Sequence, residues 1–286
     1  MIKKCLICGK KVKTKLIKLP YTENIEKTMT YEFYKCCNYI KQKNFLNNKE
    51  LSKLYSSSYL GYRKSKLWQL LKLLSTEFRI LKYGKYIKDR NILELGCGMG
   101  DFINGCTKLN PRSVNAVEIS SYACKSIKKN YPEINIMNVD IENFLSRKKY
   151  DTIFLFHVIE HVKNPTNLIR NCKKMLTKKG VIIIETPNYD SWDRFIFKDK
   201  WFNYHVPYHT YLFSPLSFKK LSKQVNLHVV GLKGCRFPNT LSVQFSDIEG
   251  IWVIFVPLII FLYILIYLVE SFFVKSGVFS VRFVRK

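Results

Sequence analysis

Between residues 91 and 232 the chain alternates short apolar runs with longer polar segments of helical periodicity. The apolar runs predict strands at 91–95, 113–119, 134–139, 150–156, 180–185 and 227–232, and the alternating run 279–284 predicts a seventh. The intervening segments predict helices. Strands that alternate with helices are typical of an α/β fold with a doubly wound, Rossmann-like parallel sheet.

Two apolar segments flank this alternation. Residues 66–84 place leucine and phenylalanine at i, i+3, i+4 spacing between lysines, which predicts an amphipathic helix over the sheet edge. Residues 251–269 are nineteen uncharged residues, enough for a membrane-spanning helix. A single crossing of the membrane would leave the run 279–284 on the far side of the bilayer, away from the rest of the predicted sheet. We therefore expect a membrane-embedded hairpin or interfacial helix, with a buried core or dimer helix as the alternative.

The charge balance favours an anionic partner. The chain has 48 Lys and Arg against 21 Asp and Glu, a formal charge of +27. The lysines are spread along the whole chain, so a dedicated nucleic-acid module is not expected, whereas an acidic lipid surface fits. A lysine-rich solvated surface is the alternative. Nine cysteines without a signal peptide indicate a reducing compartment, and we expect the cytoplasmic face of a membrane.

Four cysteines near the N-terminus have the pattern of a zinc site. Cys5 and Cys8 form a CxxC followed by glycine, which is one knuckle of a zinc ribbon. The second pair is the adjacent Cys36 and Cys37, while Tyr39 stands where a second CxxC would end. We expect a zinc-ribbon-like module that binds structural Zn²⁺ through Cys5, Cys8, Cys36 and Cys37, or a degenerate ribbon without metal.

A glycine turn follows the first predicted strand of the sheet. Gly96, Gly98 and Gly100 alternate after Glu94, and a predicted helix begins at Asp101. Strand, glycine turn and helix is the layout that binds a nucleotide-like ligand at the carboxyl end of a parallel strand. Further acids close the next two predicted strands, Glu118 the second and Asp140 the third. The spacing ExGxGxG differs from both the dinucleotide fingerprint and the phosphate loop.

This ExGxGxG form resembles the first motif of the class I S-adenosylmethionine-dependent methyltransferases. The resemblance implies a seven-stranded sheet and S-adenosylmethionine as cofactor, with Glu118 on the ribose hydroxyls, Asp140 on the adenine amino group and Ile141 on the ring. The implied cofactor-binding residues are Glu94, Gly96, Gly98, Gly100, Glu118, Ile119, Asp140, Ile141, Phe156 and His157.

The segment FHVIEHVKNP after the fourth strand resembles the ubiquinone-biosynthesis O-methyltransferase type. Some relatives have ExxEH there, proposed to hold a divalent metal, but His157 replaces the first glutamate. Glu160 and His161 could then bind a metal weakly as a pair, or support the residues that contact the cofactor. The alternative is that His161 is packed and hydrogen-bonded at the start of a helix. HxxEH also marks a zinc-peptidase family, but those histidines share one helix, whereas His157 directly follows a predicted strand.

The aromatic segment after the fifth strand predicts a lid or substrate loop. Trp201, Pro207, His209 and Phe213-Ser214-Pro215 resemble the W…PxHxxxFSP segment of the same family. His209, with His205, is the leading candidate general base, because imidazole accepts a proton near neutral pH. His161 is the third catalytic candidate. Alternatively, His209 orients substrate or packs under the lid.

These patterns predict a methyltransferase acting on a small-molecule, lipid or glycan-precursor acceptor at a membrane surface. The alternative is a catalytically inactive, methyltransferase-like adaptor for nucleic acid or membrane. Neither the acceptor nor the oligomeric state follows from the sequence. The expected domains are a zinc-ribbon-like module 1–45, a helical lid or linker 46–88, the methyltransferase domain 89–247, a hydrophobic membrane-associated segment 248–276 and the last strand 277–286.

Overall fold

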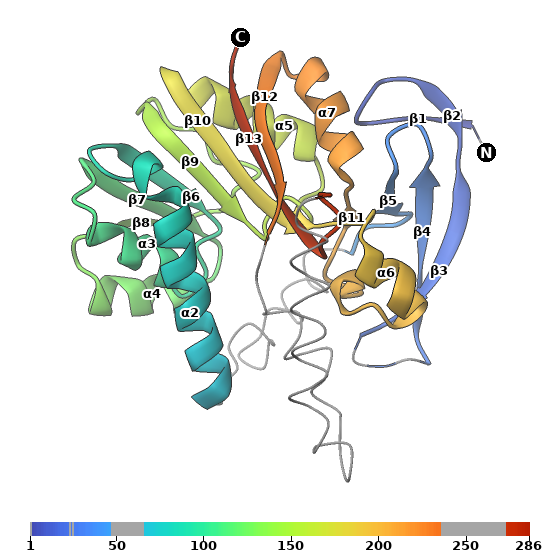
Figure 1. The fold of residues 1–286 in the computed structure, drawn as a ribbon, viewed down its shortest axis with the longest axis horizontal. Helices are drawn as coiled ribbons and strands as arrows, with labels where there is room; N and C mark the ends of the chain where they lie inside the picture. Colours follow the sequence, from blue (N-terminus) through green and yellow to red (C-terminus); the bar gives the residue numbers. More distant parts are fainter. Residues whose placement is uncertain (1, 23, 25, 47–65, 236–272) are drawn as a thin grey trace.

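A seven-stranded sheet forms the centre of the molecule (Figure 1). The computed structural model describes residues 2–22, 24, 26–46, 66–235 and 273–286. The sheet order is β12-β13-β10-β9-β6-β7-β8. Its strands are β6 (Asn91–Leu95), β7 (Ser113–Glu118), β8 (Asn135–Asn138), β9 (Tyr150–Phe156), β10 (Leu176–Pro187), β12 (Leu227–Gly234) and β13 (Val278–Arg285). Every predicted strand is present, and β10 is longer than expected.

The last strand lies inside the sheet. β13 pairs antiparallel with β10 on one side and with β12 on the other. The strands β10, β9, β6, β7 and β8 pair parallel with one another. The prediction of a seven-stranded doubly wound sheet with an antiparallel seventh strand is therefore confirmed.

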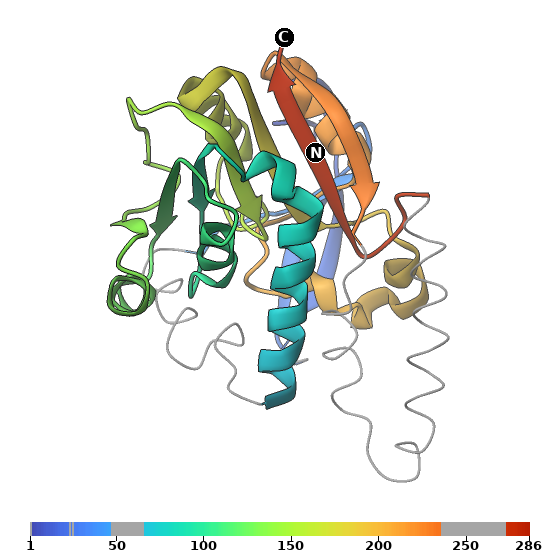
Figure 2. The ribbon, with the colours of Figure 1, turned by 60° about the vertical axis from the view of Figure 1, so that its left-hand side comes forward.

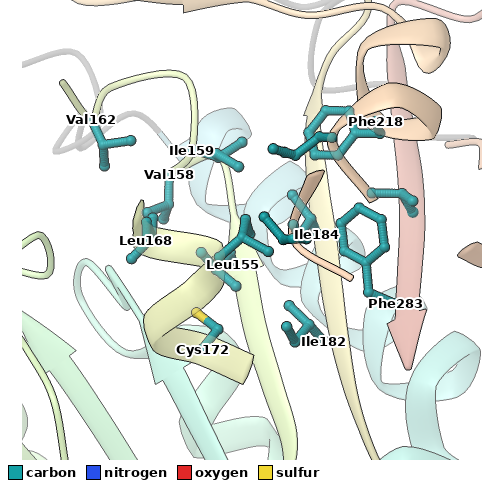
Figure 3. Packing of buried hydrophobic residues seen from close by; sticks show 14 of the residues in the cluster. Leu155, Val158, Ile159, Val162, Leu168, Cys172, Ile182, Ile184, Phe218 and Phe283 are labelled. Carbon is teal, nitrogen blue, oxygen red and sulfur yellow. The ribbon is translucent and has the colours of Figure 1, made fainter. Parts of the chain in front are cut away.

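Helices cover both faces of this sheet (Figures 1 and 2). One face packs against α2 (Lys66–Tyr83), α3 (Asp101–Thr107) and α4 (Ser121–Asn130), and the other against α5 (Pro165–Met175) and α7 (Pro215–Gln224). Side chains alternate along β9 because a strand has a period of two, so Phe154 faces the α2–α3 side and Leu155 the α5–α7 side. Figure 3 shows the hydrophobic core on the α5–α7 side, which contains Leu155 and Ile184 of the sheet and Phe218 of α7.

The N-terminal residues form two small sheets. One pairs β1 (Ile2–Lys4) with β2 (Lys11–Lys13). The other has the order β11-β5-β4-β3 and contains β3 (Lys15–Pro20), β4 (Thr28–Tyr34), β5 (Tyr39–Gln42) and β11 (Tyr211–Leu212). Because β11 belongs to the aromatic segment after β10, that segment is bound to the N-terminal residues by a shared sheet.

The aromatic segment is more ordered than a simple loop. It contains α6 (Trp192–Phe197) and two 3₁₀ turns, η3 (Lys198–Lys200) and η4 (Phe202–Tyr204), before β11. A third turn, η2 (Gly84–Tyr86), ends α2. Within the described ranges, no helix combines the length and apolar character that crossing a membrane requires. The apolar run 251–269 lies outside the described residues, as does most of the expected membrane segment 248–276.

Candidate active site

The glycine turn after β6 has the backbone that its sequence requires. Gly96, Gly98 and Gly100 have φ values of 72°, 55° and 85°, a region that side chains with a Cβ rarely adopt. A Cβ on Gly96 would lie 2.6 Å from Val158, and one on Gly100 would lie 2.9 Å from Ile127. Beyond its chain neighbours, none of the described residues has an atom within 4 Å of a Cβ placed on Gly98. Gly98 therefore presents bare backbone to open space, as a ligand cradle needs.

The three acids lie at the carboxyl ends of neighbouring strands. Glu118, the last residue of β7, accepts hydrogen bonds from the amides of Gly98 (2.9 Å) and Ser120 (2.9 Å). Its carboxylate is thus fixed beside the glycine turn. Asp140, just after β8, accepts a hydrogen bond from the Glu142 amide (2.9 Å) and begins a turn.

Glu94 is the most deeply buried of the three acids and lies one residue before the end of β6. Its side chain is only 3% exposed, and Oε2 accepts no hydrogen bond from the described part of the chain. Burial raises the pKa of Glu94 to about 8, although the charge of Arg79 opposes the shift. A buried carboxyl of this kind gains a favourable interaction when a cation arrives nearby.

Apolar residues border these acids. Ile119 is 63% exposed directly after Glu118, and Ile141 is half-buried after Asp140. Phe156 ends β9 with its ring 4.7 Å from Phe102 and beneath the Arg79 guanidinium at 4.8 Å. The structure thus brings the ten expected cofactor residues to the carboxyl ends of β6, β7, β8 and β9, and their roles in binding stay predictions.

Four of the five histidines gather beyond this edge. His157 follows β9 with φ 55°, and its Nδ1 lies 3.4 Å from Glu160 Oε1. The rings of His161 and His209 have centroids 4.8 Å apart, and those of His205 and His209 are 5.0 Å apart. His157 and Glu160 lie in a turn and not on one helix, so the arrangement expected of a zinc peptidase is absent from this segment.

Hydrogen bonds define the tautomers of two of these rings. His161 Nδ1 donates to the Tyr208 carbonyl (3.0 Å), and His209 Nδ1 donates to the Asn203 carbonyl (2.9 Å). A carbonyl only accepts, so the Nε2 atom of each neutral ring carries the lone pair. Burial lowers the pKa of His209 well below its usual value and that of His205 to about 3. Both rings are therefore neutral at pH 7.

Glu160 supplies a buried negative charge to the same cluster. Its Oε2 accepts a hydrogen bond from Thr186 Oγ1 (2.9 Å). Burial alone would raise the pKa of Glu160, but the nearby ring of His157 lowers it below the usual value. One ligand atom each from Glu160, His161 and His209 lies within 4.8 Å of the others, so this set can either stabilise a protonated imidazole or hold a divalent metal.

The N-terminal sheet fixes the loop that carries His209. Tyr31 Oη donates to the His209 carbonyl (2.8 Å). Gln42 Nε2 donates to the carbonyls of Pro207 (2.7 Å) and His209 (3.2 Å). The segment before β11 is thus anchored by side chains that lie 165 to 178 positions earlier in the chain.

The four N-terminal cysteines also meet. Sγ atoms lie 3.7 Å apart in the pair Cys5–Cys37 and 3.6 Å apart in the pair Cys8–Cys36, and all four sulfurs are within 4.8 Å of one another. Zn–S bonds of about 2.3 Å in a tetrahedron require sulfurs about 3.8 Å apart, so the cluster fits zinc. Cys37 completes the set of four thiols, and the Tyr39 hydroxyl lies 3.6 Å from Cys5 Sγ. A hydrogen bond from Cys37 helps to lower the pKa of Cys5 to about 4.

A comparison with protein families decides what this domain is. Residues 59–232, more than half of the chain, match the model of a family described as "Methyltransferase domain". The chain belongs to the methyltransferase-domain family. The matched residues of this methyltransferase domain include the glycine turn, the three acids and all four clustered histidines.

Curated relatives of the domain are methyltransferases. The chain is 30% identical over 157 residues to the ubiquinone biosynthesis O-methyltransferase of Rickettsia akari, covering 50% of this chain and 61% of the relative. It is 31% identical over 103 residues to a probable S-adenosylmethionine-dependent methyltransferase of Mycobacterium tuberculosis, covering 35% of this chain and 36% of that one. The chain thus spans between about a third and three fifths of the length of these relatives.

Solved structures share the fold of the methyltransferase domain. Coclaurine N-methyltransferase bound to N-methylheliamine and SAH is 21% identical, with a TM-score of 0.52, and the match covers 83% of this chain and 80% of that chain. The plantazolicin methyltransferase BpumL in complex with SAH is 17% identical, with a TM-score of 0.54 and coverage of 84% and 91%. At these identities the likeness concerns the fold alone.

Sequence reasoning missed the polar residues of α2 that face the methyltransferase sheet. Arg79 Nε (2.7 Å), Lys82 Nζ (3.0 Å) and Tyr83 Oη (2.7 Å) all contact the buried carboxylate of Glu185 on β10. These contacts anchor α2 beside Phe156 and bring the Arg79 cation to the expected cofactor edge. In the sequence these three residues appear only as basic and aromatic positions of an amphipathic helix. A solvated helix face has the same pattern, so the sequence alone did not identify them.

Proposed function

We propose that this chain is an S-adenosylmethionine-dependent methyltransferase that modifies a small-molecule acceptor beside the histidine cluster. The observation that carries the proposal is the open backbone at Gly98, with its amide bound to the Glu118 carboxylate at the end of the next strand. The cofactor would supply a methyl group already activated by its sulfonium, so the protein mainly aligns the reactants. An adaptor without catalytic function would not need this cradle.

The chain's own residues have distinct parts in this proposal. Glu118 and Asp140 would accept hydrogen bonds from the ribose and the adenine, and Glu94 and Arg79 would face the charged methionine portion. His209 Nε2 would accept the proton of an acceptor hydroxyl or amine, and the buried carboxylate of Glu160 would stabilise the resulting imidazolium. The Asn203 carbonyl keeps the His209 ring in the required tautomer.

The function is tested by the exchange of His209 for asparagine. We expect transfer of tritiated methyl from S-adenosylmethionine into small-molecule and lipid extracts to fall about 10²–10⁴-fold, the usual contribution of a general base. The affinity for S-adenosylmethionine should stay within about twofold, because His209 lies beyond the cofactor edge. The exposed fifth histidine provides the control His228→Asn, which should transfer normally. Wild-type transfer by His209→Asn would contradict the assignment.

Cofactor binding should depend on pH through Glu94. The pKa of this carboxyl is raised to about 8, so at pH 7 the free protein keeps it neutral. A cationic ligand favours the ionised form, so affinity should rise as pH increases from 7 to 9 and binding should release a proton. Calorimetry in buffers of different ionisation enthalpy measures that proton. In the variant Glu94→Gln the cofactor affinity should rise less between pH 7 and 9 than in the parent. If the affinities of both proteins changed identically with pH, the role of Glu94 would be refuted.

A structural zinc ion at Cys5, Cys8, Cys36 and Cys37 is the second part of the proposal. The sulfur separations support it, and the site would hold β5, which pairs with β11 next to His209. Purified protein should contain about one zinc per chain, and Cys37→Ser should lose it and melt at a lower temperature. The buried core variant Cys172→Ala should keep the metal. Full-length protein from zinc-replete cells that contains no metal would contradict this site.

We also propose that the acceptor is a lipid or lipid-linked glycan precursor at the cytoplasmic face of a membrane. The formal charge of +27 and the uncharged run 251–269 support this localisation. Because β12 and β13 share one sheet, the intervening chain must leave and return on the same side of any bilayer. Complete release of the protein from membranes by alkaline carbonate would contradict an embedded segment.

A further inference from the structure

The surface around α6 carries large apolar side chains that face solvent. Trp192, Phe195 and Ile196 on α6 are 38%, 77% and 58% exposed, and Phe273 is 65% exposed. The rings of Trp192 and Phe273 lie 5.9 Å apart. These four residues form one surface, which we call the α6 patch. Contiguous exposed apolar side chains of this size mark interaction sites more often than isolated ones do.

The α6 patch has a well-anchored support. Ser191 caps α6 by accepting a hydrogen bond from the Arg194 amide, and Trp201 Nε1 donates to Asp193 Oδ2 on the buried side of the helix (3.0 Å). The Trp192 amide donates to the Lys275 carbonyl (3.0 Å), which joins α6 to the chain that enters β13. The buried side chains of α6 therefore hold its apolar side outward.

The most apolar run of the sequence joins the described structure next to the α6 patch. The uncharged run 251–269 ends four residues before Phe273, where the described structure resumes. The other end of that connection is Cys235, whose amide donates to the Val278 carbonyl (2.9 Å), so both ends lie at the same edge of the sheet. The most apolar stretch of the sequence thus joins the fold at the α6 patch.

The charges around the α6 patch fit an anionic surface. Lys198 and Lys200 are exposed directly after α6, with Asp199 between them, and Lys275 forms an ion pair with Asp190 (2.8 Å). Basic side chains near exposed tryptophan and phenylalanine are typical of the interface between lipid headgroups and acyl chains.

The α6 patch lies at the same edge of the sheet as the candidate active site. α6 follows the carboxyl end of β10, and the glycine turn, Glu118 and His157 follow the carboxyl ends of strands that run parallel to it. Figures 1 and 2 show α6 and the lower half of α2 on this side of the molecule. A surface that covers the α6 patch would therefore also face the active-site edge.

We infer that the α6 patch docks on an anionic phospholipid bilayer and turns the active-site edge toward amphiphilic acceptors in that bilayer. The inference rests on the proposed methyltransferase function and adds the surface through which the acceptor is reached. Phe195 and Ile196 enter the headgroup region, and the neighbouring lysines contact the lipid phosphates. A second copy of this chain is the competing occupant, and the test below separates the two.

Photo-crosslinking of the full-length protein tests the docking directly. Benzoylphenylalanine in place of Phe195 should form a lipid adduct on vesicles containing about one third phosphatidylglycerol, with roughly tenfold less adduct on neutral vesicles. The same probe in place of Ile2, which is 73% exposed on β1, is the matched control and should form no lipid adduct. A protein–protein adduct at position 195, equal lipid adduct at both positions, or equal yield on neutral vesicles would overturn the inference.

A double variant separates this inference from the proposed function. Phe195→Asp with Ile196→Asp should lower methyl transfer to acceptors held in vesicles at least tenfold. The variant should bind S-adenosylmethionine with the affinity of the parent, because neither side chain belongs to the cofactor edge. Unchanged transfer to vesicle-held acceptors would refute docking and leave the methyltransferase proposal intact. If the parent protein itself did not bind S-adenosylmethionine, the methyltransferase proposal would be refuted instead.

Discussion

Replacing Gly98 by arginine should abolish S-adenosylmethionine binding and leave the protein folded. The arginine side chain would fill the open space that a Cβ at Gly98 faces, and it would bring a positive charge to a site proposed for a sulfonium. The backbone strain of a side chain at φ 55° costs only about 1–2 kcal/mol. We expect the affinity to fall by about 100-fold or more, equivalent to about 2.7 kcal/mol, in a calorimetric titration.

A matched control separates strain from occupancy. Gly9 also has a positive φ, 73°, and a Cβ there would meet no atom of the described part of the chain within 4 Å. Gly9→Arg therefore introduces the same side chain at similar strain but outside the candidate active site. Because Gly9 follows Cys8 in the proposed zinc site, the comparison uses Gly9→Arg protein with the zinc content of the parent, and its cofactor affinity should equal that of the parent. Circular dichroism of both variants reports the fold. If Gly98→Arg bound the cofactor as tightly as Gly9→Arg, the glycine turn would not be the cofactor site.

Replacing Glu185 by alanine should lower the free energy of unfolding by about 3–5 kcal/mol, because the half-buried cations Arg79 and Lys82 would lose their buried partner. Urea denaturation monitored by circular dichroism measures this change. Burial would raise the pKa of Glu185, but the charges of Arg79 and Lys82 outweigh burial and hold it at about 2. The ion pairs therefore stabilise the fold above the unfolded carboxyl pKa of about 4.5, and this stability is lost as pH falls toward 2.

An exposed ion pair of α2 provides the control for that measurement. Glu77 and Lys108 are 2.9 Å apart with side chains 43% and 62% exposed, so solvent screens their attraction. Glu77→Ala should cost less than about 1 kcal/mol. An equally small effect of Glu185→Ala would mean that the buried network does not anchor α2.

The sheet was predictable because its strands have strong local signals. Buried parallel strands such as β9 and β10 are continuous apolar runs, and the glycine turn marks the end of β6. The position of the acids also followed from sequence, because the carboxyl ends of parallel strands meet at one edge. The ends of β10 were less predictable, since Leu176 and Pro187 extend the strand through pairing with its neighbours.

The histidine cluster and its anchors were harder to predict because they depend on distant contacts. His161 and His209 lie in separate segments, and only the packing of the aromatic segment on the N-terminal sheet places their rings 4.8 Å apart. The hydrogen bonds from Tyr31 and Gln42 have no local sequence signal. Cys36 and Cys37 were doubtful ligands by spacing, yet Asn38 at φ 51° follows them and both sulfurs face the cluster.

A structure determined with S-adenosylhomocysteine bound is the most direct test of this account. We predict that its ribose hydroxyls lie within hydrogen-bonding distance of the Glu118 carboxylate and that its amino-acid portion lies above Gly98. Crystals grown in millimolar ligand that leave this edge empty, or that hold the ligand elsewhere on the protein, would contradict the central claim.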